Sequence, residues 1–152
     1  MIQDEAIRWQ KGYWDELSQR KGLRPVIDPK DMNGAKNARF DSLHKRAVEQ
    51  FLRRLGLRFP LRRVLDFGCG IGRHRLFLSS LGTSYVGVDI APGMLARNAR
   101  DTCQIDGVHL PFADGSFNLV FSFWVLQHVV EDQTLSAIVR EMSRCLSPDG
   151  AV

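Results

Sequence analysis

Beyond residue 63, short apolar runs alternate with stretches in which apolar residues recur at helical spacing. The short runs predict buried strands, and the longer stretches predict amphipathic helices. The predicted strands are residues 64–67, 85–89, 103–105 and 117–123, and the predicted helices are residues 73–81, a helix opened by Pro92, and residues 131–146. Strands that alternate with helices predict an α/β fold.

The amino-terminal part of the chain predicts two helices and a loop. Apolar residues at helical spacing predict a helix that Asp41 caps and that packs on the sheet. Residues 24–34 contain two prolines and a glycine, which is typical of a loop. An aromatic-rich helix within residues 1–22 is expected to pack on the core or over the mouth of a ligand site. We therefore expect residues 1–40 to form a cap or lid, and residues 41–152 to form the main domain.

A glycine-rich turn follows the first predicted strand, in the sequence V-L-D-F-G-C-G-I-G-R of residues 64–73. Gly68, Gly70 and Gly72 allow positive φ and a close approach of the backbone to a ligand at the amino end of a helix. The dinucleotide fingerprint G-x-G-x-x-G/A fails in both frames. Asp66 places a carboxylate beside the turn, which repels a diphosphate and favours a ligand with an ammonium or sulfonium group.

Four segments resemble, in the same order, the motifs of the class I S-adenosylmethionine-dependent methyltransferases. They are VLDFGCGIGR at 64–73, VGVDIAPGML at 86–95, IDGVHLPFADGSFNLVFS at 105–122, and VLQHV with SRCLSPDG at 125–129 and 143–150. The resemblance implies a Rossmann-like open parallel sheet with helices on both faces, and S-adenosylmethionine as the cofactor across the strand ends. It also implies methyl transfer. A small-molecule acceptor is favoured, because the Asn/Asp-Pro-Pro-Tyr signature of methylation on DNA bases and a Pro-Cys pair are both missing.

The resemblance assigns cofactor-binding roles to three carboxylates. Asp66 assists the amino-acid end of the cofactor, Asp89 accepts both ribose hydroxyls, and Asp106 accepts a hydrogen bond from the adenine amino group. Alternatively, Asp89 caps the helix opened by Pro92, and Asp106-Gly107 is a plain turn. The full set of expected cofactor-binding residues is Asp66, Gly68, Cys69, Gly70, Gly72, Asp89, Ile90, Asp106 and Gly107.

The acceptor is expected beside residues 124–130, which follow the fourth predicted strand. His128 is the residue of this region that can remove a proton near neutral pH, and a buried, hydrogen-bonded histidine is the alternative. Asn118 stands where the family usually has an acid, so a charge is lost but hydrogen-bonding capacity is kept. The three cysteines show no C-x-x-C spacing, so no metal site is expected, and Cys69 reads as a small residue in a tight place.

The composition is that of an ordinary globular protein, with 44% hydrophobic and 25% charged residues. Neither a secretory signal nor a membrane-spanning segment is expected, which makes the cytoplasm the default location. Residues 1–63 hold 15 Lys and Arg against 8 Asp and Glu, a net charge of +7, whereas residues 64–152 carry −3. The basic residues are scattered and lack a base-stacking surface, so nucleic acid is an unlikely partner.

The chain has a predicted turn at residues 147–150 and ends two residues later. A fifth strand and a hairpin follow in the resembling family, so Ala151 and Val152 read as the start of a strand, and the carboxyl-terminal strands are expected to be missing. The fourth strand then has an exposed edge, which invites self-association. Two other functions stay open: a truncated, non-catalytic cofactor-binding remnant, and a nicotinamide-dependent oxidoreductase that the failed fingerprint disfavours.

Overall fold

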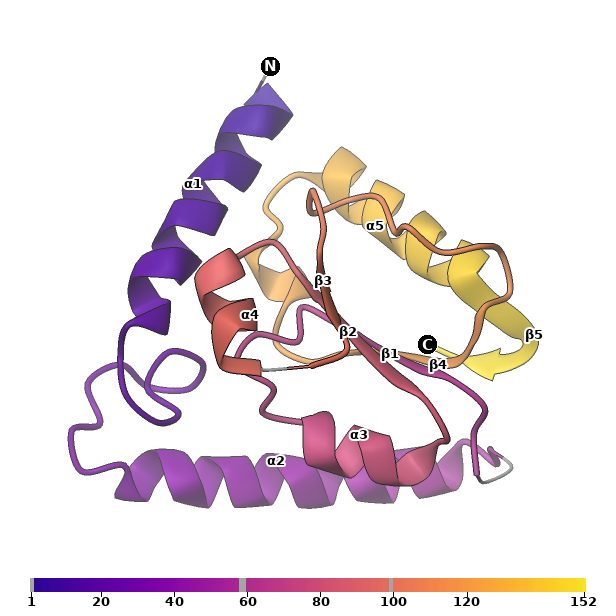
Figure 1. Ribbon diagram of the computed structural model, residues 1–152, viewed down its shortest axis with the longest axis horizontal. Coiled ribbons are helices and arrows are strands. Elements are labelled where there is room, and N and C mark those ends of the chain that lie inside the picture. Colours follow the sequence, from indigo (N-terminus) through magenta and orange to yellow (C-terminus); the bar gives the residue numbers. More distant parts are fainter. Residues whose placement is uncertain (1, 58–59, 99) are drawn as a thin grey trace.

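A computed structural model of the protein describes residues 2–57, 60–98 and 100–152 (Figure 1). In chain order the elements are α1 (Ile2–Ser18), α2 (Ala35–Arg54), β1 (Val64–Phe67), α3 (Arg75–Leu81), β2 (Tyr85–Asp89), α4 (Pro92–Asn98), β3 (Thr102–Gln104), β4 (Phe117–Ser122), the 3₁₀ helix η1 (Leu126–His128), α5 (Asp132–Cys145) and β5 (Leu146–Ala151). None of the described helices is both long enough and apolar enough to cross a membrane. The predicted alternation of strands and helices is confirmed.

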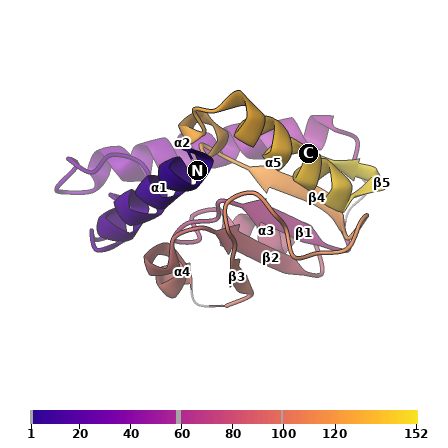
Figure 2. The same ribbon diagram turned by 90° about the horizontal axis from the view of Figure 1, so that it is seen from above.

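The strands form one parallel sheet in the order β3-β2-β1-β4-β5 (Figure 2). β1 lies in the middle, where Val64 pairs with Tyr85 of β2 on one side and with Leu119 of β4 on the other. The strand order therefore reverses between β1 and β4. Such a reversal opens a crevice outside the carboxyl ends of the strands, which is where open α/β sheets bind their ligands.

Helices cover both faces of the sheet, as predicted (Figure 1). Val64 and Leu119 are buried on the face that packs against α2 and α3, whereas Leu65 and Val120 are buried on the face that packs against α5. Adjacent strand residues thus alternate between two apolar cores. The outcome is the Rossmann-like α/β fold that the resemblance implied.

α2 begins at Ala35, earlier than the predicted N-cap Asp41. The preceding loop caps the helix instead, because the Asp31 carboxylate accepts a hydrogen bond from the backbone N–H of Asn37 at 2.7 Å. Asp41 therefore lies within the helix, where it accepts a hydrogen bond from Arg73 Nε at 2.7 Å. The prediction was wrong because an acid in the loop could not be distinguished from the acid in the helix by spacing alone.

The predicted turn at residues 147–150 is wrong, since these residues belong to β5. β5 pairs with β4 through Phe117–Leu146 and Leu119–Ala151, with a register irregularity between these two positions. Pro148 is tolerated there because an outer strand does not need every backbone N–H. The predicted bare edge of β4 is accordingly covered, and the described part of the chain forms a five-stranded sheet.

Candidate active site

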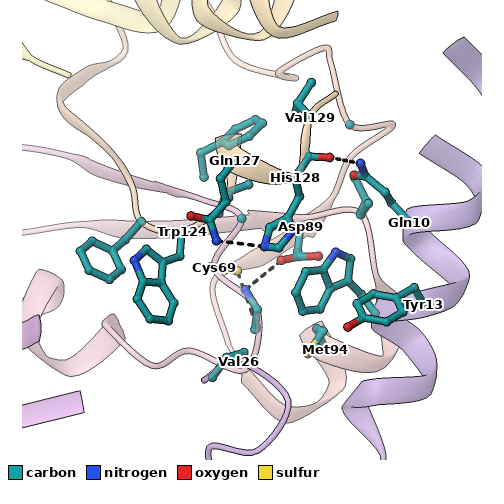
Figure 3. A pocket seen from close by; sticks show the side chains of 18 of the residues that line it. Gln10, Tyr13, Val26, Cys69, Asp89, Met94, Trp124, Gln127, His128 and Val129 are labelled. Carbon is teal, nitrogen blue, oxygen red and sulfur yellow. Dashed lines mark hydrogen bonds between the residues drawn. The ribbon is translucent and has the colours of Figure 1, made fainter. Parts of the chain in front are cut away.

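A cavity of about 300 Å³ lies at the carboxyl ends of β1, β2 and β4 (Figure 3). Its walls come from the turn after β1, the end of β2, the segment after β4 and the inner side of α1. Seven expected cofactor residues line it, namely Asp66, Gly68, Cys69, Gly70, Asp89, Ile90 and Gly107, and so does the predicted catalytic residue His128. Gly72 and Asp106 do not line it.

The turn after β1 has the positive φ angles that its glycines predicted. Gly68 has φ 72° and Gly70 has φ 50°, so both adopt conformations that side chains disfavour. The backbone N–H of Gly68 donates to the carbonyl of Val88 at 2.8 Å, which fixes the turn to the end of β2. α3 begins at Arg75, later than predicted, because residues 71–74 continue the turn.

Gly72 serves the packing of α4 rather than the cavity. Its φ is 79°, and a Cβ atom added there would lie 2.2 Å from Oδ1 of Asn98. Asn98 is buried, and its Nδ2 donates to the carbonyl of Gly70 at 3.3 Å. Gly72 therefore lets the end of α4 hold the glycine turn from behind.

Asp89 is at the centre of the site, at the end of β2. Its carboxylate accepts the backbone N–H of Gly70 at 2.8 Å and that of Ala91 at 2.9 Å. Burial raises the pKa of Asp89, and these backbone hydrogen bonds act in the opposite direction. Each carboxylate oxygen keeps lone-pair capacity beyond the bond it accepts here, so the group can accept further hydrogen bonds from a ligand.

Asp66 lies deeper, in β1 beneath the glycine turn. Its carboxylate accepts a hydrogen bond from the hydroxyl of Tyr85 at 2.9 Å. Burial raises the pKa of Asp66 to about 7, against the opposing effect of the Tyr85 hydrogen bond. A carboxyl group poised in this way gains charge when a cationic ligand approaches.

Cys69 packs its thiol under the glycine turn. A Cβ atom at Gly87 of β2 would lie 2.7 Å from the Cys69 sulfur, so the two residues fit closely. Burial raises the pKa of the Cys69 thiol, with smaller contributions from the charges of Asp66 and Asp89. A thiolate nucleophile is disfavoured here.

Asp106 forms the turn that its neighbour Gly107 predicted. Its carboxylate accepts the backbone N–H groups of Val108 and His109, both at 2.8 Å, and contacts the His109 ring at 2.6 Å. Gly107 and Ile90, by contrast, do reach the cavity. This side of the site therefore presents backbone and an apolar wall, with the carboxylate of Asp106 directed to its own turn.

His128 ends η1 and faces the cavity with its ring between two other residues. Its Nε2 lies 3.4 Å from the side-chain amide of Gln127, and its ring meets Trp14 edge-on with 5.1 Å between centroids. Its backbone carbonyl accepts a hydrogen bond from Gln10 of α1 (Figure 3). Burial lowers the pKa of His128, so the neutral, proton-accepting form prevails at neutral pH.

The structure shows two buried side chains that the sequence pattern did not identify, Arg73 and His74. They lie beside the end of β4, opposite α1. Arg73 is almost completely buried, and its guanidinium lies 5.4 Å from the ring centroid of Phe123 and 5.8 Å from that of Trp124. His74 is also buried, and neither of its ring nitrogens has a hydrogen-bond partner among the described residues. These positions depend on packing between distant elements, and no spacing in the sequence signals them.

The cavity fits S-adenosylmethionine. The glycine turn lets a ligand lie close to the backbone, and the buried carboxylate of Asp89 can accept hydrogen bonds from hydroxyl groups. Met94 and Ile105 add apolar wall beside Ile90. Asp66 lies where a cationic group is favoured. Among the described residues, no group of three or more His, Cys, Asp and Glu could hold a metal ion.

This fold and this cavity define an α/β nucleotide-binding domain of the class I S-adenosylmethionine-dependent methyltransferases. The chain belongs to the methyltransferase domain family, which matches residues 65–152, more than half of its length. The cofactor of this family is S-adenosylmethionine. The resemblance found in the four sequence segments is confirmed.

Two named methyltransferases are similar to this chain. Methyltransferase GfsG of Streptomyces halstedii is 28% identical over 91% of this chain and 47% of its own length. The demethylmenaquinone methyltransferase of Mycolicibacterium vanbaalenii is 38% identical over 60% of this chain and 40% of its own length. This chain thus spans less than half the length of these relatives.

A solved structure shares the fold. Phosphoethanolamine N-methyltransferase 1 of Haemonchus contortus, in complex with phosphoethanolamine and S-adenosylhomocysteine, matches with a TM-score of 0.71 at 20% identity. The match covers 95% of this chain and 31% of that one. The helices before β1 are therefore included in the shared architecture.

Proposed function

We propose that the protein transfers the methyl group of S-adenosylmethionine to a small-molecule acceptor. The observation that carries this proposal is a single cavity lined by two chemically different sets of residues. Asp89 and the glycine turn line it with hydrogen-bonding groups, and His128 and the aromatic residues after β4 line the same cavity. A cofactor and an acceptor can therefore meet within one cavity.

The cofactor, when bound, supplies a methyl group activated by a sulfonium leaving group. The protein then needs to align the acceptor and to keep water out, and such positioning contributes roughly 7 to 11 kcal/mol to rate acceleration. The apolar walls exclude water, and neutral His128 takes the proton that an acceptor hydroxyl or amine releases as it gains the methyl group. His128 is the proposed general base.

The other cavity-lining residues are proposed to bind the parts of the cofactor. Asp66 faces the cationic amino-acid end, Asp89 binds ribose, and the backbone of Gly107 with the side chain of Ile90 frames adenine. Asp106 is proposed to reach adenine only when its turn opens, because its carboxylate accepts three hydrogen bonds within the turn. A non-catalytic remnant that only binds cofactor is the alternative.

The acceptor end is lined mainly by apolar and aromatic side chains, which supports a small organic acceptor. The name of the demethylmenaquinone methyltransferase relative agrees with an acceptor of low polarity. All three cysteines are free, which supports a reducing compartment such as the cytoplasm. Self-association through an outer strand is a further proposal, with β5 in place of the covered β4.

Residues 1–40 are proposed to act as the cap of this site. α1 supplies Gln10, Tyr13 and Trp14 to the cavity wall, and the carboxylate of its Asp15 accepts the backbone N–H of Gly93, in the first turn of α4, at 2.8 Å. α2 starts within the proposed cap and continues into the main domain. The cap is therefore α1 and the loop that follows it.

The test is calorimetric titration with S-adenosylmethionine and, separately, with NAD, followed by an assay for labelled methyl transfer. Asp89→Asn is expected to weaken S-adenosylmethionine binding at least about tenfold, because a hydrogen bond to a charged group contributes roughly 1.5–3 kcal/mol. Asp149→Asn, an exposed acid on β5, is the matched control and should bind as the wild type does. Tight NAD binding, or unchanged binding by Asp89→Asn, contradicts the proposal, and binding without any methyl transfer favours the remnant.

A further inference from the structure

Trp124, two residues after β4, has a backbone conformation that tryptophan rarely adopts. Its φ is 60°, and among the described non-glycine residues Asp101 is the other with positive φ. Asp101 has a short polar side chain, which tolerates this conformation, whereas for a bulky side chain the same conformation is strained. Strain of this kind persists where the surrounding structure enforces it, and it is concentrated at functional sites.

The next residue, Val125, holds the backbone in place. A Cβ atom at Gly68 would lie 2.3 Å from Cγ2 of Val125, so the valine fills the space left by the missing side chain of the glycine turn. The segment after β4 is thereby pressed onto the cofactor end of the cavity. Because Val125 points to the glycine turn, the side chain of Trp124 is directed elsewhere.

The indole of Trp124 lines the cavity and is held by three neighbouring side chains. His44 meets it edge-on at 4.5 Å between centroids, Phe123 lies nearly parallel at 5.9 Å, and the guanidinium of Arg73 lies 5.8 Å from its ring centroid. Asp41 holds Arg73 at 2.7 Å. Trp124 as a whole nevertheless remains 43% exposed and lines the cavity, where Figure 3 shows its indole across from Tyr13 with Asp89 between them.

We propose that Trp124 is the stacking platform for the methyl acceptor, and that the acceptor carries a planar aromatic ring. This inference rests on the proposed methyltransferase function and names its substrate class. A clamped indole gives a flat apolar surface beside the cofactor end, which suits offset stacking of a second ring. Trp14 and Tyr13 of α1 supply the facing aromatic wall.

The charge beside the platform selects among ligands that bind an indole. A cationic amine also binds to tryptophan faces, but the guanidinium of Arg73 already lies against this ring. Its partner Asp41 is shared with Lys45, at 2.8 Å, so this cluster has a net positive charge. The cluster repels a second cation and favours a neutral or electron-rich ring, such as a phenol.

The experiment uses 1-naphthol as a planar phenolic probe and 1-decalol, its saturated counterpart, as a non-planar one. Calorimetry measures each probe against the protein with and without saturating S-adenosylhomocysteine. Trp124→Gly is the principal variant, because glycine accepts the positive φ and the fold is retained. We expect it to bind 1-naphthol about tenfold more weakly than the wild type, the loss of one stacked ring with its buried area.

Two controls make the result specific. Trp124→Phe keeps an aromatic face and is expected to stay within about threefold of the wild type. Phe51→Ala removes an exposed ring of α2 outside the cavity and should leave binding unchanged. The wild type should bind 1-decalol more weakly than 1-naphthol. Trp124→Gly should bind the two probes with almost equal affinity.

The outcomes separate the two proposals. No 1-naphthol binding by the wild type, equal binding by Trp124→Gly, or equal affinity for the two probes overturns the platform. Failure of S-adenosylhomocysteine to bind, measured in the same samples, overturns the proposed function. The probe titrations made without S-adenosylhomocysteine still decide the role of Trp124. A melting temperature of Trp124→Gly that lies well above the temperature of the titrations excludes unfolding as the cause of a loss.

Discussion

His74 and Asp66 line the same cavity and have ionisation equilibria shifted in opposite directions. Burial lowers the pKa of His74 to about 4, with a smaller effect from the charge of Arg73. Burial raises the pKa of Asp66 to about 7. Both groups are therefore held neutral by the fold over much of the range between pH 4 and 7, and each links folding to pH.

His74→Phe is expected to resist acid better than the wild type. Below the ordinary histidine pKa the unfolded chain binds a proton that folded His74 refuses, so His74 lowers the free energy of unfolding as the pH falls toward 4. Phenylalanine keeps the ring between Phe121 and Phe123 and removes two ring nitrogens without partners among the described residues. Denaturant unfolding should show an advantage over the wild type that grows by about 2 kcal/mol from pH 7 to pH 5.

Asp66→Asn is the counterpart in the same experiment. Folded Asp66 holds a proton between pH 4 and 7 that the unfolded chain has released, so its contribution to stability is present at low pH and is lost as the pH rises to 7. The asparagine variant should therefore lose stability relative to the wild type on acidification, by about 2 kcal/mol over the same interval. Parallel curves for both variants and the wild type would show that neither group is held neutral.

The site was predictable from the sequence where its residues lie in one turn or close a strand. Asp66, the glycines and Asp89 follow directly from strand ends in a parallel sheet. Residues 124–130 were expected beside the acceptor, but the particular roles of Arg73, His74 and Trp124 could not be identified, because they depend on α2 and β4 meeting beside α3. Asn118 kept its predicted hydrogen-bonding capacity: its Oδ1 accepts the backbone N–H groups of Arg62 and Arg63, at 3.1 and 3.2 Å.

Among the elements, α4 and the glycine turn are joined through Gly72. Gly72→Ala should destabilise the protein by about 2 kcal/mol or more, because positive φ and the contact with Asn98 are both penalised. Gly22→Ala is the matched variant, since Gly22 has φ 60° and nothing within 4 Å of an added Cβ. It carries the conformational penalty alone, about 1 kcal/mol. Equal losses, measured by thermal unfolding, would refute the role of Asn98.

Element identities were predictable, but two element ends were not. Periodicity identified α2, yet its start depended on which of several polar residues bonded the first N–H groups, and Asp31 did so in place of Asp41. β5 was missed because Ser-Pro-Asp-Gly favours a turn when considered locally. Pairing with β4 outweighs that preference, and pairing is a tertiary interaction that the local pattern does not contain.

At the scale of the whole molecule, Arg97 holds the cap to the main domain. Its guanidinium donates to the backbone carbonyls of Ser18, Arg20 and Gly22 at 2.9, 2.7 and 2.9 Å. These bonds tie the end of α1 to α4. Because α1 supplies one wall of the cavity, its attachment and the closure of the site are coupled.

Arg97→Met should loosen α1 without unfolding the sheet. Hydrogen exchange of the α1 amides is expected to quicken about tenfold, since hydrogen bonds from a charged group contribute roughly 1.5–3 kcal/mol. β1 and β4 should keep their protection. Arg140→Met, at an exposed position of α5, is the control and should change neither. Faster exchange throughout the chain would instead point to global destabilisation.

The contact between Gly68 and Val125 has a consequence for changing the acceptor by directed evolution. The side chain of Val125 packs directly on Gly68, so a side chain added at Gly68 would displace the loop that carries Trp124. The side chain at position 124 does not take part in this contact, to which the residue is linked only through the backbone. A library that varies Trp124 while Gly68 and Val125 stay constant can therefore explore new acceptors, whereas one that varies all three risks losing the cofactor in most of its members.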